Sequence, residues 1–484
     1  MKYAVSLLLL FCGVLTAQSS GTFGLTGKMT VPRIGHTATL LQSGKVLICG
    51  GGSEQSSLAA VWPSAELYDP VTGTFAATGN MTRPRWYHTA TLLPDGKVLI
   101  AGGTASNNAN GVSVERSAEL YDPDSGAFTA TADMTTARMF HSATLLNDGR
   151  VLIAGGLGIF VGVNGFLASS EVYDPVAGAF TRAGDMTHQR IGPTAALLPN
   201  GKVLVAAGHG SDDGPIPDIE AYDPASSAFS VAGAAGSWAT IGPAIVSVLP
   251  NGRVLVNMNL YDSPTTAAQL YDPVSMNFTP TGNMTATRTF TSTLLSTGTV
   301  LTAGRALDSS LASADVYEPA MGVFSPAGDM ITPRTGHTAT LLSDGTVLLA
   351  GGITSLTWRA LSAAELYRPA QVAPAPRLYS LAGTAAGAIL HAGTNRVVSR
   401  NDPAVVGEAL EIYGAGLLDG SVIPPHVTIG GRMAEVLFFG NAPGYAGLSQ
   451  INARVPGGVA PGPAVPVRLT YLTRPSNEVA IEVR

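Results

Sequence analysis

The chain has 484 residues, of which 45% are hydrophobic and only 12% are charged, and it contains 57 glycines and 32 prolines. This composition excludes a disordered chain, because disorder goes with low hydrophobicity and high charge. A formal net charge of −6 with no basic block argues against a nucleic-acid partner. Many turn residues combined with few charges are typical of an all-β protein.

The N-terminus has the features of an export signal. Lys2 precedes an apolar stretch from Ala4 to Val14, which is followed by small residues. This stretch is short for a membrane span and predicts a signal peptide over residues 1–17. No later segment has about 18 consecutive apolar residues. We therefore expect a secreted or periplasmic protein whose mature chain has no membrane span.

A unit of about 50 residues repeats along the chain. In one copy, a segment from Met81 to Gly103 is followed by a variable stretch and then by Ala118-Glu-Leu-Tyr-Asp-Pro. The tyrosine of this last motif recurs as Tyr68, Tyr121, Tyr173, Tyr222, Tyr271, Tyr317 and Tyr367. Such a period predicts the blades of a β-propeller.

Each unit contains four predicted strands. His88–Leu93 and Lys97–Ala101 are the first two, and Asp95-Gly96 between them tolerates the positive φ of a tight hairpin. Ala65–Tyr68 is an example of the third strand. It ends at an Asp-Pro turn, and Phe75 opens the fourth strand. Four antiparallel strands make one blade.

The fourth-strand phenylalanine indicates how the ring closes. Phe23 precedes the first complete unit, and no equivalent phenylalanine follows Tyr367. The strand Thr22-Phe23-Gly24 is therefore expected to complete the last blade, which ties the two ends of the ring together. We predict an all-β fold with a seven-bladed propeller over residues 21–369, closed by the N-terminal strand.

After the seventh tyrosine the repeat stops. Ala373-Pro-Ala-Pro lies in a Pro/Ala-rich segment, residues 370–384, which is predicted to be a linker. Residues 385–484 have strand-like runs between Gly/Pro turns, as in a small β-sandwich. Gly407–Gly416 resembles the opening of immunoglobulin-like TIG domains. Residues 442–456 resemble a C-terminal module of many secreted bacterial proteins, and this resemblance implies no chemistry.

The repeat unit resembles the kelch repeat, including the Gly-Gly pair after the second strand and the tyrosine of the third. The likeness weakens in the fifth and sixth units, where Asn257-Met-Asn and Ala303-Gly304-Arg305 replace the glycine pair. Strand direction places the variable segments after Gly-Gly and the linkers between units on one face. Binding usually occurs at variable loops on a rigid scaffold, so we expect function on that face.

Histidine recurs at one position, eight residues before the hairpin glycine, as His36, His88, His141 and His337. The four units that carry it are neighbours once the ring closes. Four imidazoles at the mouths of first strands could bind a metal or an anionic ligand. The interpretation we favour is that they are repeat residues that bond between blades. No carboxylate alternates with them in metal-ligand spacing, so no metal site is predicted.

Opposite charges also recur at fixed positions. The arginines are Arg33, Arg85, Arg138, Arg190 and Arg334, and the glutamates are Glu66, Glu119, Glu171, Glu220 and Glu365. Because buried charges need partners, this regularity predicts blade-to-blade ion pairs rather than a substrate clamp. Trp86, Trp62, Trp358 and Phe160 are irregular aromatic residues in the same face segments, where aromatic rings suit stacking on sugars or peptides.

Arg85-Trp-Tyr-His, followed by Leu-Leu-Pro-Asp-Gly-Lys-Val, resembles the galactose oxidase strand that supplies a copper-binding Tyr-His pair. That family also joins a kelch propeller to a C-terminal immunoglobulin-like domain, and the resemblance would make Tyr87 and His88 ligands. The family needs a second tyrosine and a cross-linked cysteine at positions equivalent to Tyr87. Those positions hold Gly35, Phe140, Gly192, Pro243, Thr289 and Gly336. The one cysteine beyond the predicted signal peptide is Cys49, so the radical cofactor cannot be assembled in that family's way.

Two functions remain. The first is a secreted kelch-propeller binding protein that recognises a carbohydrate or protein ligand on the variable-loop face. The residues expected to bind are Trp86, Tyr87, His88, His36, His141, His337 and Arg85, with the loops after Gly103 and Gly156. The alternative is a metal-dependent, galactose oxidase-like oxidoreductase. The missing ligands favour a binding protein without a cofactor over an enzyme. We expect the protein to be a monomer.

Overall fold

The computed structural model describes residues 21–54, 60–108, 111–160, 163–210, 216, 218–234, 245–257, 267–286, 288–306, 312–354, 359–445 and 447–484. The predicted signal peptide lies outside these residues. The regular elements within them are β-strands. In the same part of the chain, no helix is long and apolar enough to cross a membrane.

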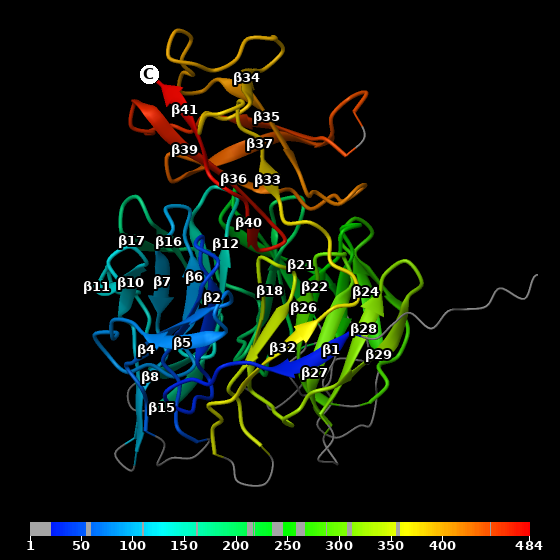
Figure 1. Ribbon diagram of the computed structural model, residues 1–484. Helices are drawn as coiled ribbons and strands as arrows, with labels where there is room; N and C mark the ends of the chain where they lie inside the picture. Colours follow the sequence, from blue (N-terminus) through cyan, green and yellow to red (C-terminus); the bar gives the residue numbers. More distant parts are fainter. Residues whose placement is uncertain are drawn as a thin grey trace, which may run out of the picture.

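Seven four-stranded antiparallel sheets form the blades of a propeller (Figure 1), as predicted. The innermost strand of each blade comes first in its repeat. These first strands are β2 (Thr37–Leu40), β6 (Thr89–Leu92), β12 (Ser142–Leu145), β18 (Thr194–Leu197), β22 (Ile245–Val248), β26 (Arg288–Leu294) and β30 (Thr338–Leu341). Each contacts the first strands of the two neighbouring blades, including β2 with β30, so the ring is closed.

The second strands form the buried middle of each blade. They are β3 (Val46–Cys49), β7 (Val98–Ala101), β13 (Val151–Ala154), β19 (Val203–Ala206), β23 (Val254–Asn257), β27 (Val300–Ala306) and β31 (Val347–Ala350). All four residues of β7 are buried. Both faces of this strand meet a neighbouring blade, which is why its sequence is a continuous apolar run instead of an alternating one.

The third strands are β4 (Ala65–Asp69), β10 (Ala118–Asp122), β16 (Ser170–Asp174), β20 (Asp218–Asp223), β24 (Ala268–Asp272), β28 (Ser313–Glu318) and β32 (Ala364–Arg368). The fourth strands are β5 (Thr74–Ala77), β11 (Ala127–Ala130), β17 (Ala179–Arg182), β21 (Ala228–Ala234), β25 (Asn277–Pro280), β29 (Val323–Asp329) and β1 (Thr22–Leu25). The repeat tyrosine packs on the repeat phenylalanine in every blade, with ring centroids between 4.8 and 5.2 Å apart. This pair explains the spacing of the aromatic residues in the repeat.

The N-terminal strand closes the ring as the displaced phenylalanine predicts. Strand β1 pairs with β32, with Phe23 opposite Tyr367. Their ring centroids are 5.0 Å apart. The last blade is thus built from both ends of the propeller sequence.

Deleting residues 21–27 should therefore strip the seventh blade of its outer strand. We expect the free energy of unfolding to fall by several kcal/mol, because an unpaired strand edge and the apolar surface under Phe23 become exposed. Thermal and urea unfolding of the truncated chain measure this loss. Equal stability of the two chains would contradict a structural role for β1.

The C-terminal strands form a second β domain with its own apolar core. They are β33 (Arg377–Leu378), β34 (Ile389–His391), β35 (Ala409–Ala415), β36 (His426–Ile429), β37 (Arg432–Asn441), β38 (Ser449–Arg454), β39 (Gly462–Tyr471), β40 (Arg474–Pro475) and β41 (Val479–Val483). All nine belong to one antiparallel sheet whose strand β33 also contacts β39, so the sheet is nearly closed and barrel-like. Strand β33 lies inside residues 370–384, the segment interpreted as a linker.

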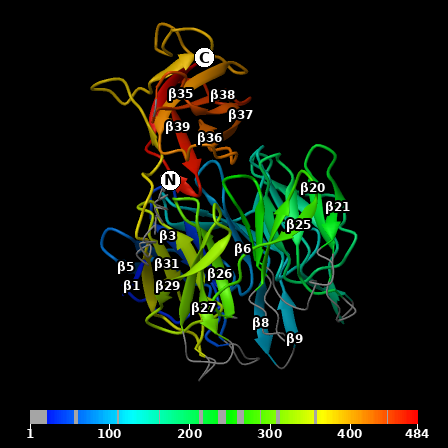
Figure 2. The same cartoon turned by 90° about the vertical axis from the view of Figure 1, so that its right-hand side faces the viewer.

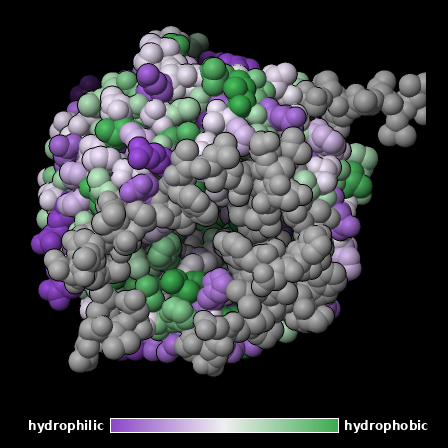
Figure 3. All heavy atoms as spheres, turned by 90° about the horizontal axis from the view of Figure 1, so that it is seen from below, coloured by the Kyte–Doolittle hydropathy of each residue, from purple (hydrophilic) through white to green (hydrophobic). Residues whose placement is uncertain are grey.

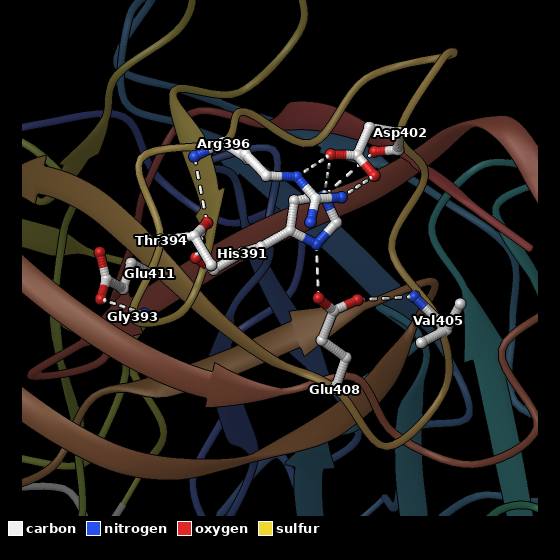
Figure 4. A network of polar contacts seen from close by, with 8 residues as sticks. All are labelled: His391, Gly393, Thr394, Arg396, Asp402, Val405, Glu408 and Glu411. Carbon is white, nitrogen blue, oxygen red and sulfur yellow. Dashed lines mark hydrogen bonds and ion pairs between the residues drawn. The ribbon is translucent and has the colours of Figure 1, made fainter.

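A buried histidine anchors a loop to this sheet (Figure 4). The Nδ1 atom of His391 bonds the Glu408 carboxylate, and Nε2 lies 3.1 Å from the carbonyl oxygen of Asp402. Arg396 pairs with the Asp402 carboxylate. The loop between β34 and β35 is thereby held by charged groups on both sides of one imidazole.

The C-terminal domain lies on the propeller face that carries the Asp-Gly hairpins (Figures 1 and 2). Arg474, 3% exposed, donates to the carbonyl oxygens of Ser343 at 2.6 Å, Ala373 at 2.9 Å and Pro374 at 3.2 Å. A cavity of about 670 Å³ lies between all seven first strands and this domain, whose Leu472-Thr473 turn lines it. One end of the central channel is thus covered, and the variable-loop face points the other way.

Candidate ligand-binding face

Two hairpins project from the face opposite the C-terminal domain (Figures 1 and 2). Strands β8 (Thr104–Asn108) and β9 (Gly111–Val114) pair in blade 2, and β14 (Leu157–Phe160) and β15 (Val163–Phe166) pair in blade 3. They are the segments expected to vary after the glycine pair. Seen from this side, the molecule is hollowed near its middle, and hydrophobic residues border the hollow (Figure 3).

The residue before the repeat histidine position, which holds Pro193 in blade 4, has a left-handed backbone at the mouth of the channel. Its φ is 62° at Gly35, 56° at Tyr87, 53° at Phe140, 65° at Gly192 and 62° at Gly336. The amide of Tyr87 donates to the Gly35 carbonyl at 3.1 Å, and the amide of Phe140 donates to the Tyr87 carbonyl at 3.2 Å. This position therefore carries a chain of backbone hydrogen bonds from one blade to the next.

Aromatic rings occupy that position in blades 2 and 3. The ring centroids of Tyr87 and Phe140 are 4.0 Å apart, and Trp86 stacks on Tyr87 at 4.4 Å. Trp86 is only 3% exposed and packs between Ile34 and Ile353, so it supports Tyr87 from behind and offers no open face. Tyr87 and Phe140 are half-buried and border the mouth. Burial raises the pKa of Tyr87, which keeps its hydroxyl protonated.

Phe140 is a candidate site residue that the sequence did not single out. From the sequence, position 140 is notable only because it holds phenylalanine where the copper-binding family would have a second tyrosine. The signal was present, because this repeat position holds an aromatic residue in two adjacent units and glycine in the units on either side. Of the other aromatic candidates, Trp62 donates its Nε1–H to the Pro32 carbonyl at 3.0 Å, which is a packing role. Trp358 and the side chain of Phe160 lie outside the described residues.

The four repeat histidines lie between blades, each 5 or 6% exposed. In each case Nε2 bonds a threonine hydroxyl on the first strand of the preceding blade. The pairs are His36–Thr338 at 3.1 Å, His88–Thr37 at 3.0 Å, His141–Thr89 at 2.9 Å and His337–Thr291 at 3.2 Å. These contacts agree with the interpretation of interblade bonding and leave the imidazoles away from the open surface.

Burial holds these imidazoles neutral. It lowers the pKa of His36, His88 and His337 to about 3, with further lowering by the arginine three residues earlier. The pKa of His141 is likewise well below its usual range, first because of burial and then because of Arg138.

Arg85 also lies inside the blade, fully buried, with its guanidinium 2.8 Å from Glu119. The same ion pair recurs as Arg33–Glu66, Arg138–Glu171, Arg190–Glu220 and Arg334–Glu365, at distances between 2.7 and 3.0 Å. The pairing is confirmed, but the expectation that it links different blades is wrong. Each arginine, on the linker entering a blade, reaches the third strand of that same blade, and the glutamate also accepts from the linker backbone, as at Thr82.

Known proteins resemble the chain in its repeats and in its fold. No family model matches the chain. Human Kelch-like protein 34 is 26% identical over 184 residues, 38% of this chain and 28% of that protein. Galactose oxidase of Gibberella zeae is 32% identical over 123 residues, 23% of this chain and 18% of that protein. The chain thus matches less than a third of the length of either relative.

A solved structure shares the whole architecture. It is a fungal alcohol oxidase of the AA5 family in complex with copper, with a TM-score of 0.61 and 17% identity. The match covers 96% of this chain and 100% of the other. This likeness is one of fold.

The residues at the equivalent mouth do not fit a copper ion. His88 Nε2 is engaged by Thr37, and Cys49 Sγ lies 3.7 Å from that nitrogen inside the blade interface. The Tyr87 ring stacks on Trp86 and packs against Phe140 at a tilt. Across the described ranges, no group of three or more His, Cys, Asp or Glu side chains is placed to hold a metal ion.

The 50-residue repeat, the closed ring of seven four-stranded blades and the similarity to kelch proteins lead to one assignment. The described strands from β1 to β32 form a closed seven-bladed β-propeller whose repeats are similar to those of kelch proteins.

Proposed function

We propose that the protein is an exported binding protein whose variable-loop face recognises a carbohydrate or protein ligand at the Tyr87–Phe140 mouth. The observation that carries this proposal is the asymmetry of the mouth. Two adjacent blades place aromatic rings in contact there, while blades 1, 4 and 7 have glycine at the same position. Export rests on the signal-like sequence of residues 1–17 and remains part of the proposal.

Backbone strain supports a functional reason for the two aromatic side chains. A bulky residue with a left-handed backbone costs on the order of 1–3 kcal/mol, a cost that glycine avoids. Gly35, Gly192 and Gly336 show that the ring can be built with glycine at this position. Strain of this kind is retained where a side chain serves binding, so Tyr87 and Phe140 are the residues we assign to the ligand.

The two projecting hairpins support this assignment. The β8–β9 and β14–β15 hairpins come from the same two blades as the aromatic pair. Aromatic rings are common at binding surfaces for proteins and sugars. The opposite face is covered by the C-terminal domain, which leaves the variable-loop face as the accessible one.

The alternative, a galactose oxidase-like, metal-dependent oxidoreductase, has weaker support. It shares the fold, but the donor atoms that it needs are engaged in contacts between blades or are replaced by glycine and phenylalanine.

The proposal is tested by replacing both aromatic residues with the glycine of the other blades. The purified chain is screened on a glycan array and a peptide-display library, and each hit is titrated. In the Tyr87→Gly/Phe140→Gly variant we expect affinity to fall more than about tenfold, as for aromatic anchors in other interfaces. The melting temperature should change little, because the lost ring packing is offset by the relieved strain.

A matched control lies on the other face of the ring. Val71 is 93% exposed in the turn between β4 and β5, and Val71→Ser should leave binding unchanged. Shortening both hairpins should weaken the same ligand. A ligand whose affinity is unaffected by the glycine substitutions and by trimming the hairpins would show that this face is not the binding site.

A further inference from the structure

The outward face of three neighbouring C-terminal strands carries aromatic and amide side chains that no contact with the propeller explains. Strand β38 lies between β35 and β37, and side chains alternate between the core and the outside. On the outward face, Glu411, Asn452 and Phe438 form one row across the three strands. The next row consists of Tyr413, Gln450 and Gly440. We call Phe438, Asn452, Gln450, Tyr413 and Glu411 the Phe438 platform.

A β-bulge turns the phenylalanine outward. The register of β37 against β38 shifts between Val436 and Phe438, so Leu437 is the extra residue and Phe438 faces the same side as Asn452. Phe438 is 44% exposed. Its ring tip lies 3.5 Å from the point where a Cβ of Gly440 would be, so the ring leans along the strand over the glycine. One side of the ring is thereby left open to solvent.

The polar members of the platform are held in place by one another. Gln450 Nε2 donates to Asn452 Oδ1 at 2.9 Å, and the Tyr413 hydroxyl donates to Glu411 Oε2 at 3.1 Å. The second oxygen of Glu411 accepts from the Gly393 amide at 3.0 Å (Figure 4). Burial, Glu411 and then the nearby Tyr445 raise the pKa of Tyr413, so its hydroxyl stays protonated. Tyr445 itself is 68% exposed.

The charge pattern favours an uncharged ligand. Both Glu411 oxygens already accept hydrogen bonds, and Arg454 at the border of the platform is paired with Glu435 at 2.9 Å. The polar groups turned to solvent are therefore amides and a hydroxyl. Phe438 also borders a cleft of about 870 Å³ between the C-terminal domain and the blade 3 and 4 hairpins, into which a chain longer than one residue could continue.

We propose that the Phe438 platform binds a neutral carbohydrate chain. A sugar ring stacks its C–H face on the open side of Phe438, and its hydroxyls exchange hydrogen bonds with Asn452, Gln450 and the Tyr413 hydroxyl. A flat hydrophobic ring bordered by planar amides matches a pyranose, which has an apolar face and a rim of hydroxyl groups. This site is separate from the mouth of the propeller.

The test is affinity gel electrophoresis of the full chain in gels containing a soluble β-1,4-glucan, β-1,3-glucan, xylan, mannan or galactan. We expect at least one polysaccharide to retard the wild-type chain. Phe438→Ala and Asn452→Ala should each raise the dissociation constant for that polysaccharide about tenfold or more, since each removes a contact made by the ligand.

Val274→Ala is the control, because Val274 is 93% exposed in the turn between β24 and β25 and lines neither the platform nor the adjoining cleft. It should leave retardation unchanged. The proposal is wrong if no polysaccharide retards the chain, if Val274→Ala is as damaging as Phe438→Ala, or if only peptides bind this face. The Tyr87→Gly/Phe140→Gly variant should keep its retardation, which separates this site from the mouth of the propeller.

Discussion

Lowering the pH from 7 to 4.5 should sharply reduce the free energy of unfolding. The folded chain holds His36, His88 and His337 neutral with pKa values of about 3, and His141 behaves in the same way. In the unfolded chain each would titrate at its ordinary pKa of about 6.5. The stability that these residues confer is fully present above pH 6.5 and is lost as the pH falls. The reason is that the histidines become protonated in the unfolded chain while they remain neutral in the folded chain. Each of these histidines lowers the free energy of unfolding by about 1.4 kcal/mol for every pH unit below 6.5.

Urea unfolding at several pH values between 7 and 4.5 measures this slope. Carboxylates with lowered pKa values, such as Asp69 and Asp223, add to acid sensitivity only near and below pH 4, so this range isolates the histidines. In His88→Gln, a neutral group still able to bond Thr37, we expect the slope to fall by about 1.4 kcal/mol per pH unit. His188→Gln is the control, since that imidazole is 43% exposed. Identical slopes in His88→Gln and wild type would contradict the buried neutral state.

Removing one partner of a buried ion pair should destabilise the propeller far more than removing both. Arg85→Met would leave Glu119 buried without its cation, which costs about 3–5 kcal/mol in comparable pairs. Arg85→Met/Glu119→Gln should recover most of that loss, because no uncompensated charge remains. Blade 5 carries such a replacement naturally, with buried Gln269 at the glutamate position and Ile241 at the arginine position of the sequence.

A double-mutant cycle by urea unfolding tests this expectation. The coupling energy between Arg85 and Glu119 should be a large fraction of the cost of either single change. The exposed pair Arg182–Asp185 is the comparison, with side chains 67% and 45% exposed, and its removal should have little effect. Additive losses at Arg85 and Glu119 would mean that the pair is not coupled in the folded state.

The repeat alone determined the blades, their number and the closure of the ring. Every blade uses the same local signals: a hairpin turn such as Asp95-Gly96, an apolar second strand and a Tyr–Phe pair. Because those signals recur every 50 residues or so, one unit predicts the others. The displaced Phe23 likewise predicted a pairing across the whole ring, and β1 pairs with β32. The arginine and glutamate positions predicted ion pairs because a charge inside a blade requires a counter-charge.

The tertiary structure decided which side chains remain accessible. Trp86 and Tyr87 are adjacent in sequence, yet Ile34 and Ile353 from blades 1 and 7 bury the first and leave the second at the mouth beside Phe140. The C-terminal domain covers the hairpin face through contacts such as Arg474 with Ser343, which are 131 residues apart. Exposure depends on neighbours brought together only when the ring closes and the second domain docks, and no local pattern carries that information.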